Sequence, residues 1–415
     1  MKDFILSLTP RWALDAYHLA WAHGSAWWYG HPSAKLVVIG VTGTKGKSTT
    51  AELIRHMLAQ TGHEVALAST IRFMVGEATE RNLFKMTMPG RGYIQQFLRR
   101  ALDAGCTHAV VELTSEGALQ HRHAGLELNA LVFTNLAPEH IERHGSYEAY
   151  ASAKLSLAAH LAASPKRPRI IVANQDDAYG EKFLAVDADI KAPFSLKDAE
   201  PYTADDRSVR FLWQGMLFSI PLPGLFNLKN CLAALTLGQA LGLSSERMKQ
   251  ALEHVQPVAG RAERVEQGQP FAAVVDYAHT PDSLKALYET YANKRLICVL
   301  GSTGGGRDTW KRPEMGRMAD ELCDIAILTE EDPYDEDPQK IIEELAAGFS
   351  ARRPRVIPDR RAAIAAAIKE AKDQDDAVLI TGKGTDPYIM GPKGSKAPWS
   401  DAKVVEEELI KLGYN

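Results

Sequence analysis

The sequence lacks long apolar runs. Nowhere in its 415 residues does an apolar stretch approach the roughly 20 residues that a membrane-spanning helix needs. The apolar run near the N-terminus is too short for a signal peptide, because Pro10 and Arg11 interrupt it. We therefore expect a cytoplasmic protein without membrane insertion.

Cysteine is also scarce, and neither sign of charge is in large excess. The chain has four cysteines and no C-x-x-C pair, so we expect all four to be reduced core residues. They are Cys106, Cys231, Cys298 and Cys323. The formal net charge is only −4, which gives no reason to expect a nucleic-acid or anionic-membrane partner, because such partners usually need a concentrated basic surface.

What the sequence does contain is a regular alternation of β-rich and helical segments from residue 36 onward. This alternation predicts an α/β protein. We expect a P-loop central domain with a mostly parallel sheet over 36–258, then a C-terminal Rossmann-like, doubly wound domain over 259–415. Residues 1–35 predict one amphipathic helix and an aromatic loop, and the segment 195–222 predicts a short antiparallel hairpin.

The segment "GVTGTKGKSTT", residues 40–50, follows the apolar run "KLVVI" and precedes a predicted helix. Such a glycine-rich turn can point backbone N–H groups at phosphates, and the helix N-terminus adds a partial positive charge. Lys47 would reach the β and γ phosphates of ATP, and the hydroxyl of Ser48 or Thr49 would ligate Mg²⁺. The predicted ATP-binding residues of this loop are Gly43, Thr44, Lys45, Gly46, Lys47, Ser48 and Thr49.

This loop is a variant, since its glycines at 40, 43 and 46 do not follow the spacing G-x-x-x-x-G-K-[ST]. A glycine-rich turn without function is the alternative, but strand, loop, lysine, hydroxyl and helix occur in order. Glu112 ends the buried run "AVVEL" on a neighbouring predicted strand, where a carboxylate would complete a Mg²⁺ site. The alternative for Glu112 is a solvated residue at a strand end.

Several motifs occur together in the order and approximate spacing found in Mur ligases. They are "GVTGTKGKSTT", "ELTSEGALQHR", "TNLAPEHIERHGSYEAYASAK", "PGLFNLKNCLAA", "GRAERV", "VVDYAHTPDSL", "GSTGGGRDTWKRPEMG" and "GKG". From about residue 29 to the C-terminus the chain resembles the MurE type, which adds an amino acid to a UDP-N-acetylmuramoyl dipeptide. The resemblance implies an ATP-dependent ligase of peptidoglycan or related cell-wall peptide synthesis: an acceptor carboxylate attacks the γ-phosphate, and an amine displaces phosphate from the acyl phosphate.

The resemblance also implies roles for individual residues. The catalytic set would be Lys47, Glu112, His140 and Lys154. His140 would help to hold a second metal ion, and Lys154 would be carbamylated, because the CO₂ adduct of a lysine is an anion that can face Mg²⁺. Without the family, His140 would be a loop histidine and Lys154 a solvated helix lysine. The metal set would be Ser48, Glu112, His140 and Lys154.

The remaining implied contacts fall into three groups. Asn227 and Asn230 match positions near the adenine of ATP. The C-terminal domain would contact ATP through Arg261, Asp276, Tyr277 and His279. The substrate residues would be Thr87, Ser115, Arg122, Arg307, Asp332, Tyr334, Gly382 and Asp386. Among these, Arg307 would bind the carboxylate of the incoming amino acid through both oxygens.

Three departures from the MurE pattern concern the substrates. Only 35 residues precede the first predicted strand, so we expect the uridine-binding N-terminal domain to be absent. The loop "EEDPYDEDP" has Tyr334 in place of an arginine and three acids before it, a pattern that favours a basic amino acid such as lysine or ornithine over diaminopimelate; a flexible acidic loop facing water is the alternative. "GKGTDPY" has Asp386 in place of a longer carboxylate, and "MTMPG" has Met88 in place of a threonine.

The alternatives left open are a ligase acting on a non-UDP acceptor, such as a folylpolyglutamate-synthase-type enzyme, a P-loop kinase, and a nucleotide-binding scaffold without catalysis. "DYAHTPDSL" argues against the folate enzyme. We expect small-molecule partners: ATP with Mg²⁺, an amino acid and a carboxylate acceptor, among which a muramoyl peptide is a candidate. We expect a monomer, with a partner subunit as an open alternative.

Overall fold

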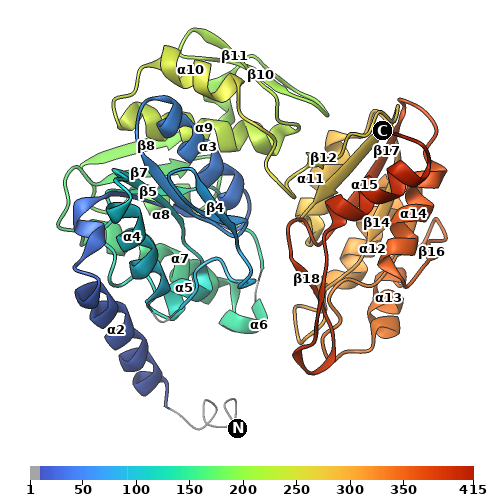
Figure 1. Ribbon diagram of the computed structural model, residues 1–415, viewed down its shortest axis with the longest axis horizontal. Helices are drawn as coiled ribbons and strands as arrows, with labels where there is room; N and C mark the ends of the chain where they lie inside the picture. The colour runs from blue at the N-terminus through green and yellow to red at the C-terminus, as the bar shows by residue number, and fades with distance from the viewer. Residues whose placement is uncertain (1–9, 91, 140) are drawn as a thin grey trace. The chain divides into compact units, whose positions relative to one another are not determined.

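The computed structural model describes residues 10–90, 92–139 and 141–415 (Figure 1). The chain divides into two compact units, which are described separately. Unit 1 comprises the chain up to Pro201, then Leu212–Phe218 and Lys229–Val255, and unit 2 comprises Tyr202–Phe211, Ser219–Leu228 and the chain from Gln256 onward.

Unit 1 is built on an eight-stranded sheet with the order β4-β3-β2-β5-β1-β6-β7-β8. Its strands are β1 (Val37–Thr42), β2 (Val65–Ala68), β3 (Arg72–Val75), β4 (Ala78–Arg81), β5 (His108–Glu112), β6 (Ala130–Phe133), β7 (Ile170–Asn174) and β8 (Ile190–Phe194). Six neighbouring strands run parallel to one another, in the order β2, β5, β1, β6, β7 and β8. Strands β3 and β4 extend the edge next to β2 and pair in antiparallel fashion. The strands at the centre are mostly apolar and are buried apart from the first residues of β1 and β5, as expected for a parallel sheet covered on both faces.

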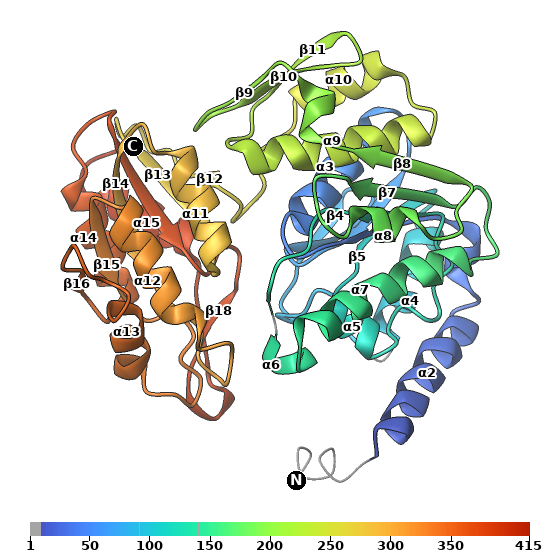
Figure 2. The ribbon, with the colours of Figure 1, turned by 180° about the vertical axis from the view of Figure 1, so that it is seen from behind.

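Helices cover this sheet on both faces (Figure 2). The helices of unit 1 are α2 (Arg11–Trp28), η1 (Pro32–Lys35), α3 (Lys47–Gln60), α4 (Tyr93–Asp103), α5 (Ser115–Leu119), α6 (Ile141–His144), α7 (Tyr147–Ala162), α8 (Gly180–Leu184), η2 (Leu196–Ala199) and α10 (Ser245–Glu253), with α9 (Leu225–Ala240) beginning in unit 2. Several starts follow from the sequence, because serines at N-cap positions accept backbone N–H groups: Ser146 does so for α7 and Ser244 for α10.

A three-stranded sheet with the order β11-β10-β9 is formed by β9 (Tyr202–Ala204), β10 (Val209–Trp213) and β11 (Met216–Ile220). The turn between β10 and β11 consists of Gln214 and Gly215, both with positive φ (49° and 77°). Two successive positive φ values match the twist of a two-residue hairpin turn. The hairpin predicted within 195–222 is therefore confirmed.

Unit 2 is a doubly wound domain. Its sheet has the order β12-β13-β17-β14-β15-β16, formed by β12 (Glu263–Arg264), β13 (Ala272–Asp276), β14 (Arg295–Leu300), β15 (Ile325–Leu328), β16 (Arg355–Val356) and β17 (Asp376–Thr381). Its other elements are α11 (Pro281–Thr290), α12 (Lys311–Leu322), α13 (Pro338–Ala346), α14 (Arg360–Glu370), α15 (Asp401–Lys411), η3 (Pro392–Gly394) and the hairpin of β18 (Tyr388–Met390) and β19 (Lys396–Pro398). Separate apolar clusters lie on the two faces, one including Leu284 and Met315 and the other including Ile364 and Val405. The predicted fold class is confirmed.

The prediction that all four cysteines are reduced is wrong for one pair. Cys298 and Cys323 form a disulfide with a Cα–Cα distance of 6.2 Å, whereas Cys106 and Cys231 are free and buried. The two bonded cysteines are 25 residues apart in sequence. They meet because α12 carries the chain from β14 back to the start of β15, which pairs in parallel with β14.

Two further features bear on the expectations. The helix predicted within residues 1–35 is α2, and it extends through Trp27 and Trp28. Within the described part of the chain, none of the helices combines the length and the apolar character that a bilayer crossing demands.

Candidate active site

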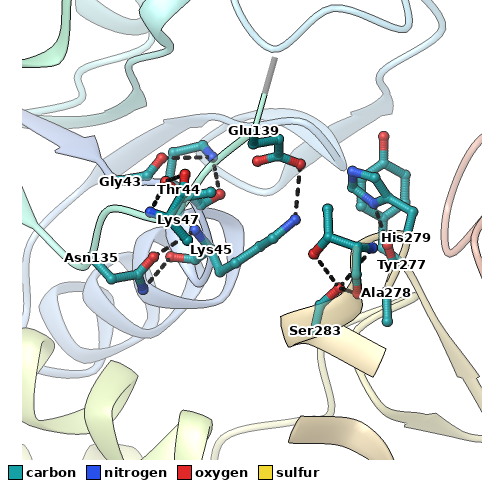
Figure 3. Close-up of polar contacts among 12 residues, drawn as sticks. Gly43, Thr44, Lys45, Lys47, Asn135, Glu139, Tyr277, Ala278, His279 and Ser283 are labelled. Carbon is teal, nitrogen blue, oxygen red and sulfur yellow. Dashed lines mark hydrogen bonds and ion pairs between the residues drawn. The ribbon is translucent and has the colours of Figure 1, made fainter. Parts of the chain in front are cut away.

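The glycine-rich loop between β1 and α3, part of which is drawn in Figure 3, has two positions where only glycine fits the backbone. Gly43 and Gly46 have φ values of 147° and 80°. A Cβ added at Gly43 would lie 1.9 Å from Thr134 Oγ1, and one at Gly46 would lie 2.3 Å from Asn230 Oδ1. Gly46 is the N-cap of α3, so the helix begins where the loop ends, as predicted.

We expect Gly46→Ala to weaken nucleotide binding about tenfold or more and to lower the free energy of unfolding by about 1–3 kcal/mol, because it combines a strained φ with a steric clash. The matched control is Gly62→Ala, at the other end of α3. Gly62 also has a positive φ (97°), but nothing lies within 4 Å of its added Cβ. Nucleotide titration and chemical denaturation of both variants separate the two contributions. Equal losses of nucleotide affinity in the two variants would contradict the role assigned to the loop.

The loop is held by the chain that follows β6. Thr44 N donates to Asn135 O (2.8 Å) and Lys45 N to Asn135 Oδ1 (2.9 Å), while Asn135 Nδ2 donates to Lys45 O (3.1 Å). Thr134 Oγ1 donates to the same carbonyl at 2.7 Å. Asn135 was quoted within a motif but was not identified as a site residue. Because β1 and β6 are parallel neighbours, the chain following each strand reaches the same edge of the sheet, and this adjacency could have indicated it.

Three lysine side chains lie at the loop: Lys45 and Lys47 from the loop and the start of α3, and Lys154 from α7. Lys47 Nζ donates to the carbonyls of Gly43 (3.0 Å) and Thr44 (2.9 Å). Lys45 Nζ forms an ion pair with Glu139 at 2.8 Å (Figure 3). Lys154 Nζ donates to Gly43 O at 2.7 Å from the buried face of α7. The structure thus brings these three predicted residues to one loop.

Lys154 is buried, with a relative exposure of only 2%. Burial lowers the pKa of its amine well below the ordinary lysine value; the positive charge of Lys47, and more weakly that of Lys45, acts in the same direction, and Glu139 opposes them. The alternative that Lys154 is a solvated helix lysine is therefore excluded. Tyr150, one turn earlier in α7, contacts the Lys154 amine through its ring and bonds Thr44 Oγ1 through its hydroxyl at 2.9 Å.

Glu112 ends β5, in register with Val41 on the adjacent strand β1. Its side chain is fully buried, which excludes the solvated strand-end alternative. The carboxylate accepts hydrogen bonds from Thr70 N (3.0 Å) and Thr70 Oγ1 (3.0 Å), and that hydroxyl lies 2.7 Å from Thr87 Oγ1. Thr70, which the sequence did not single out, thus connects the predicted metal-binding carboxylate with the predicted substrate residue.

The other residues of the predicted metal set are only partly assembled. Ser48 and Thr49 are buried in the first turn of α3. His140 lies outside the described residues. Among the residues that the structure does describe, no cluster of three or more histidine, cysteine or acidic side chains could hold a metal ion.

The predicted acceptor and adenine residues are placed as follows. Ser115, at the start of α5, bonds His144 Nε2 at 3.1 Å. The Arg122 guanidinium donates to the Met88 carbonyl, so it lies beside the segment that contains Thr87. Asn230 Oδ1 accepts a hydrogen bond from Thr50 Oγ1 (3.2 Å). Asn227, at the start of α9, instead donates from Nδ2 to the Pro223 carbonyl at 2.8 Å.

In unit 2, the motif "DYAHTPDSL" forms a compact turn between β13 and α11. Asp276 accepts N–H groups from Ala262 and Ala278, both at 2.6 Å. His279 Nδ1 lies 2.6 Å from the Tyr277 carbonyl, and Thr280, the N-cap of α11, forms a capping box with Ser283 (Figure 3). Three predicted residues of this unit, Asp276, Tyr277 and His279, therefore lie together in this turn.

The ring of Tyr277 is the centre of that group. The Arg261 guanidinium lies over the ring at 4.4 Å from its centroid, and the His279 ring packs against it edge-on at 4.7 Å. The negative charge of Asp386, together with burial, raises the pKa of the Tyr277 hydroxyl, and Arg261 opposes this shift. The phenol therefore stays protonated at neutral pH, and it lies near the predicted substrate residue Asp386.

The acidic loop after β15 is less negative than its sequence indicates. Asp332 is buried and forms an ion pair with the fully buried Lys383 at 2.7 Å, and it also accepts the Met390 N–H at 2.8 Å. The expectation that its charge is free to face a substrate is therefore corrected. The sequence could not show this, because the compensating lysine lies 51 residues away in "GKG".

Glu331, in the same loop, has one buried carboxylate oxygen without a hydrogen-bond partner. Its Oε1 accepts a hydrogen bond from Thr303 Oγ1 at 2.6 Å, whereas its Oε2 is buried with no hydrogen-bond partner. That oxygen lies 2.1 Å from the position a Cβ would take at Gly382, whose φ is 107°. Burial raises the pKa of Glu331, and the charge of Asp332 adds to the rise.

Two predicted substrate residues remain. Tyr334 has a left-handed backbone (φ 53°), and its ring lies against Gly305. Arg307 is half-buried in the loop between β14 and α12. Both thus lie on loops that follow strands of the doubly wound sheet, where ligands of such folds bind.

A strand, a glycine-rich loop and a helix in unit 1, together with a doubly wound unit 2, are typical of nucleotide-dependent enzymes. The family model described as "Mur ligase middle domain" matches residues 41–238, and the one described as "Mur ligase, glutamate ligase domain" matches residues 260–384.

Individual proteins agree with these matches. A UDP-N-acetylmuramyl-tripeptide synthetase of Roseiflexus sp. (strain RS-1) is 38% identical over 420 residues, covering 94% of this chain and 82% of the relative. A UDP-N-acetylmuramoyl-L-alanyl-D-glutamate–2,6-diaminopimelate ligase of Geobacillus kaustophilus (strain HTA426) is 36% identical, covering 88% of this chain and 77% of the relative. The chain belongs to the Mur ligase family, whose members are ATP-dependent ligases that form amide bonds.

Solved structures show the same fold. The structure of a UDP-N-acetylmuramoyl-L-alanyl-D-glutamate–2,6-diaminopimelate ligase superposes with a TM-score of 0.62 at 27% identity, covering 96% of this chain and 84% of that one. A folylpolyglutamate synthase of Mycobacterium tuberculosis superposes with a TM-score of 0.71 at 18% identity, covering 89% and 93%, and shares the fold. The predicted resemblance to the MurE type is confirmed.

Proposed function

We propose that the protein uses ATP to join an amino acid to the carboxylate of a muramoyl-dipeptide acceptor, through an acyl phosphate. The observation that carries this proposal is the convergence of Lys47 and the buried Lys154 on the carbonyl of Gly43, in a loop that begins a helix. Backbone N–H groups, a helix N-terminus and positive side chains at one point suit a polyphosphate.

The residues present also fit Mg²⁺, which prefers oxygen ligands. The hydroxyl of Ser48 and the carboxylate of Glu112 supply oxygens, and His140 would contribute at a second ion. The lowered pKa of Lys154 leaves a larger fraction of neutral amine, the form that adds CO₂. When bound, Mg²⁺ would neutralise charge on the phosphates. Glu112 is held in one orientation by Thr70, and the Lys47 ammonium would stabilise the negative charge of the transferred phosphoryl group.

In unit 2, Arg307 would bind the carboxylate of the incoming amino acid, and Asp386 would accept its ammonium group. Arg261, Asp276 and His279, which also belong to unit 2, would contribute contacts to ATP. Asn227 and Asn230 would contact the adenine, and Ser115 and Arg122 the acceptor. These assignments follow the family pattern, and each can be tested by substituting the named residue.

The test is ADP release by the purified chain, with UDP-N-acetylmuramoyl-L-alanyl-D-glutamate as acceptor and a panel of amino acids. We expect release to require both substrates, and hydroxylamine to trap the acyl phosphate as a hydroxamate. Phosphorylated acceptor that resists hydroxylamine would instead indicate a kinase. Release with a folyl glutamate and not with the muramoyl acceptor would indicate the folate-type alternative.

We expect the amino acid to carry a basic side chain, with lysine or ornithine preferred over diaminopimelate by about tenfold or more in kcat/KM. Tyr334 offers no positive charge to a distal carboxylate, and Glu331 Oε2 is an unpaired acceptor in the same loop. Amino-acid competition in the ligation assay measures the preference. A Glu331→Gln variant should reduce it, and a clear preference of the wild type for diaminopimelate would contradict it.

A further inference from the structure

Helix α2 exposes an unusual number of aromatic side chains. The chain contains seven tryptophans, and Trp12, Trp21, Trp27 and Trp28 all belong to this one helix. Trp12, Trp27 and Trp28 are 74%, 72% and 75% exposed. Large apolar side chains gathered in this way on a surface mark an interaction site more often than isolated ones do.

The aromatic residues are outside because small residues face the rest of unit 1. Ala22, Ser25 and Ala26 are the buried positions of α2. Ser25 Cβ lies 2.6 Å from the position a Cβ would take at Gly92, and the Ala22 carbonyl is similarly close to Gly125. The helix therefore packs through one narrow stripe, and both views show it extending away from the body of unit 1 (Figures 1 and 2).

The exposed face has the composition of a segment that lies at a lipid–water boundary. Tyr17, Trp21 and Trp28 are spaced so that they follow one side of the helix, and the rings of Tyr17 and Trp21 pack edge-on at 6.4 Å. Tryptophan and tyrosine favour the boundary between lipid headgroups and acyl chains, because one end of each ring system is apolar and the other forms hydrogen bonds.

A lipid surface fits this face better than a protein partner does. Between Arg11 and Trp28 the only fully charged residues are Arg11 and Asp15, so few charges would lose hydration when this helix enters the headgroup region of a bilayer. The nine residues that precede Pro10, "MKDFILSLT", add Phe4, Ile5, Leu6 and Leu8 shortly before the helix in sequence. Apolar character thus continues from the helix into the adjoining sequence.

We propose that α2 docks the protein on the surface of a lipid bilayer, with the helix lying in the headgroup region. This goes beyond the proposed function and does not depend on it. The buried stripe of α2 lies against Gly92 and Gly125. Gly92 follows Met88 closely in sequence, and Gly125 follows Arg122, whose guanidinium bonds the Met88 carbonyl. Docking would therefore bring the predicted acceptor side of unit 1 close to the bilayer. Because the attraction comes from aromatic burial, neutral lipids suffice.

The test is partitioning of the full chain onto phosphatidylcholine vesicles, followed by co-sedimentation and by the blue shift of tryptophan emission. We expect measurable binding, and a partition coefficient at least about tenfold lower in the triple variant Trp12→Ser, Trp27→Ser, Trp28→Ser. The matched control is Trp310→Ser, which removes a 49% exposed tryptophan of unit 2 and should leave partitioning unchanged. Thermal denaturation checks that both variants fold.

Three outcomes would overturn the proposal. The wild type fails to partition, the triple variant partitions as well as the wild type, or Trp310→Ser reduces binding equally. If the wild type fails to partition and forms a dimer that the triple variant does not form, a second copy covers the face instead. Ligase activity with the soluble acceptor is measured in parallel, so a failure here is distinguishable from a failure of the proposed function.

Discussion

Replacing Lys47 with methionine is expected to lower the rate of ADP formation by about three orders of magnitude. The Lys47 ammonium is held at the loop by the carbonyls of Gly43 and Thr44, which places a fixed positive charge where we expect the phosphates. Methionine keeps the unbranched, flexible shape of the side chain, one atom shorter, and removes the charge. Because phosphoryl transfer depends on charge neutralisation and positioning, the loss should appear mainly in kcat.

The control for Lys47→Met is Lys182→Met, which also removes a lysine from unit 1. Lys182 lies over the Tyr179 ring at 4.3 Å and has no assigned part in the reaction. Both variants should unfold at temperatures close to that of the wild type, so that a lost rate cannot be attributed to lost structure. Turnover by Lys47→Met within a fewfold of the wild type would exclude the loop as the phosphate site.

The second large effect is expected at Lys154, where Lys154→Met should lower turnover by about a hundredfold or more. Its amine is buried against Gly43 and has a lowered pKa, so a larger fraction is neutral and able to add CO₂. As pH falls through the lowered pKa, the amine becomes protonated and the carbamate is lost. Activity should therefore depend on added bicarbonate, and more strongly at lower pH.

Two measurements check the account of Lys154. With ¹³C-bicarbonate, the wild type should show a carbamate carbon signal by NMR that Lys154→Met lacks. The folded state disfavours the protonated amine, so this cost is absent above the ordinary lysine pKa and develops as pH falls toward the lowered one. As pH is lowered from high to neutral, the free energy of unfolding of Lys154→Met should therefore rise relative to that of the wild type. A missing carbamate signal combined with a fully active variant would contradict the role.

The sequence was sufficient for the fold class and for the loop, because both depend on local patterns. The run "KLVVI" followed by glycines and a lysine defines β1, the loop and α3 without reference to other segments. Glu112 was identified in the same way, since it ends a buried strand next to β1.

What the sequence could not predict are the partners contributed by distant segments. Asn135 shapes the loop from a segment 90 residues away, and Thr70 orients Glu112 from 42 residues away. Lys383, 51 residues away, neutralises the negative charge of Asp332, so the acidic loop has less free charge than its sequence indicates. The Cys298–Cys323 disulfide likewise depends on how α12 returns the chain to β15. Such pairings appear only once the strands are ordered.

The most direct test of the central claim follows oxygen atoms. The acceptor UDP-N-acetylmuramoyl-L-alanyl-D-glutamate is labelled with ¹⁸O in its glutamate carboxylates and incubated with the protein, ATP, Mg²⁺ and lysine. Attack of the carboxylate on the γ-phosphate, followed by displacement by the amine, predicts that one ¹⁸O atom appears in the released phosphate for each amide formed. Amide formation with no ¹⁸O in the phosphate would contradict an acyl phosphate, and with it the assignment of the loop around Lys47.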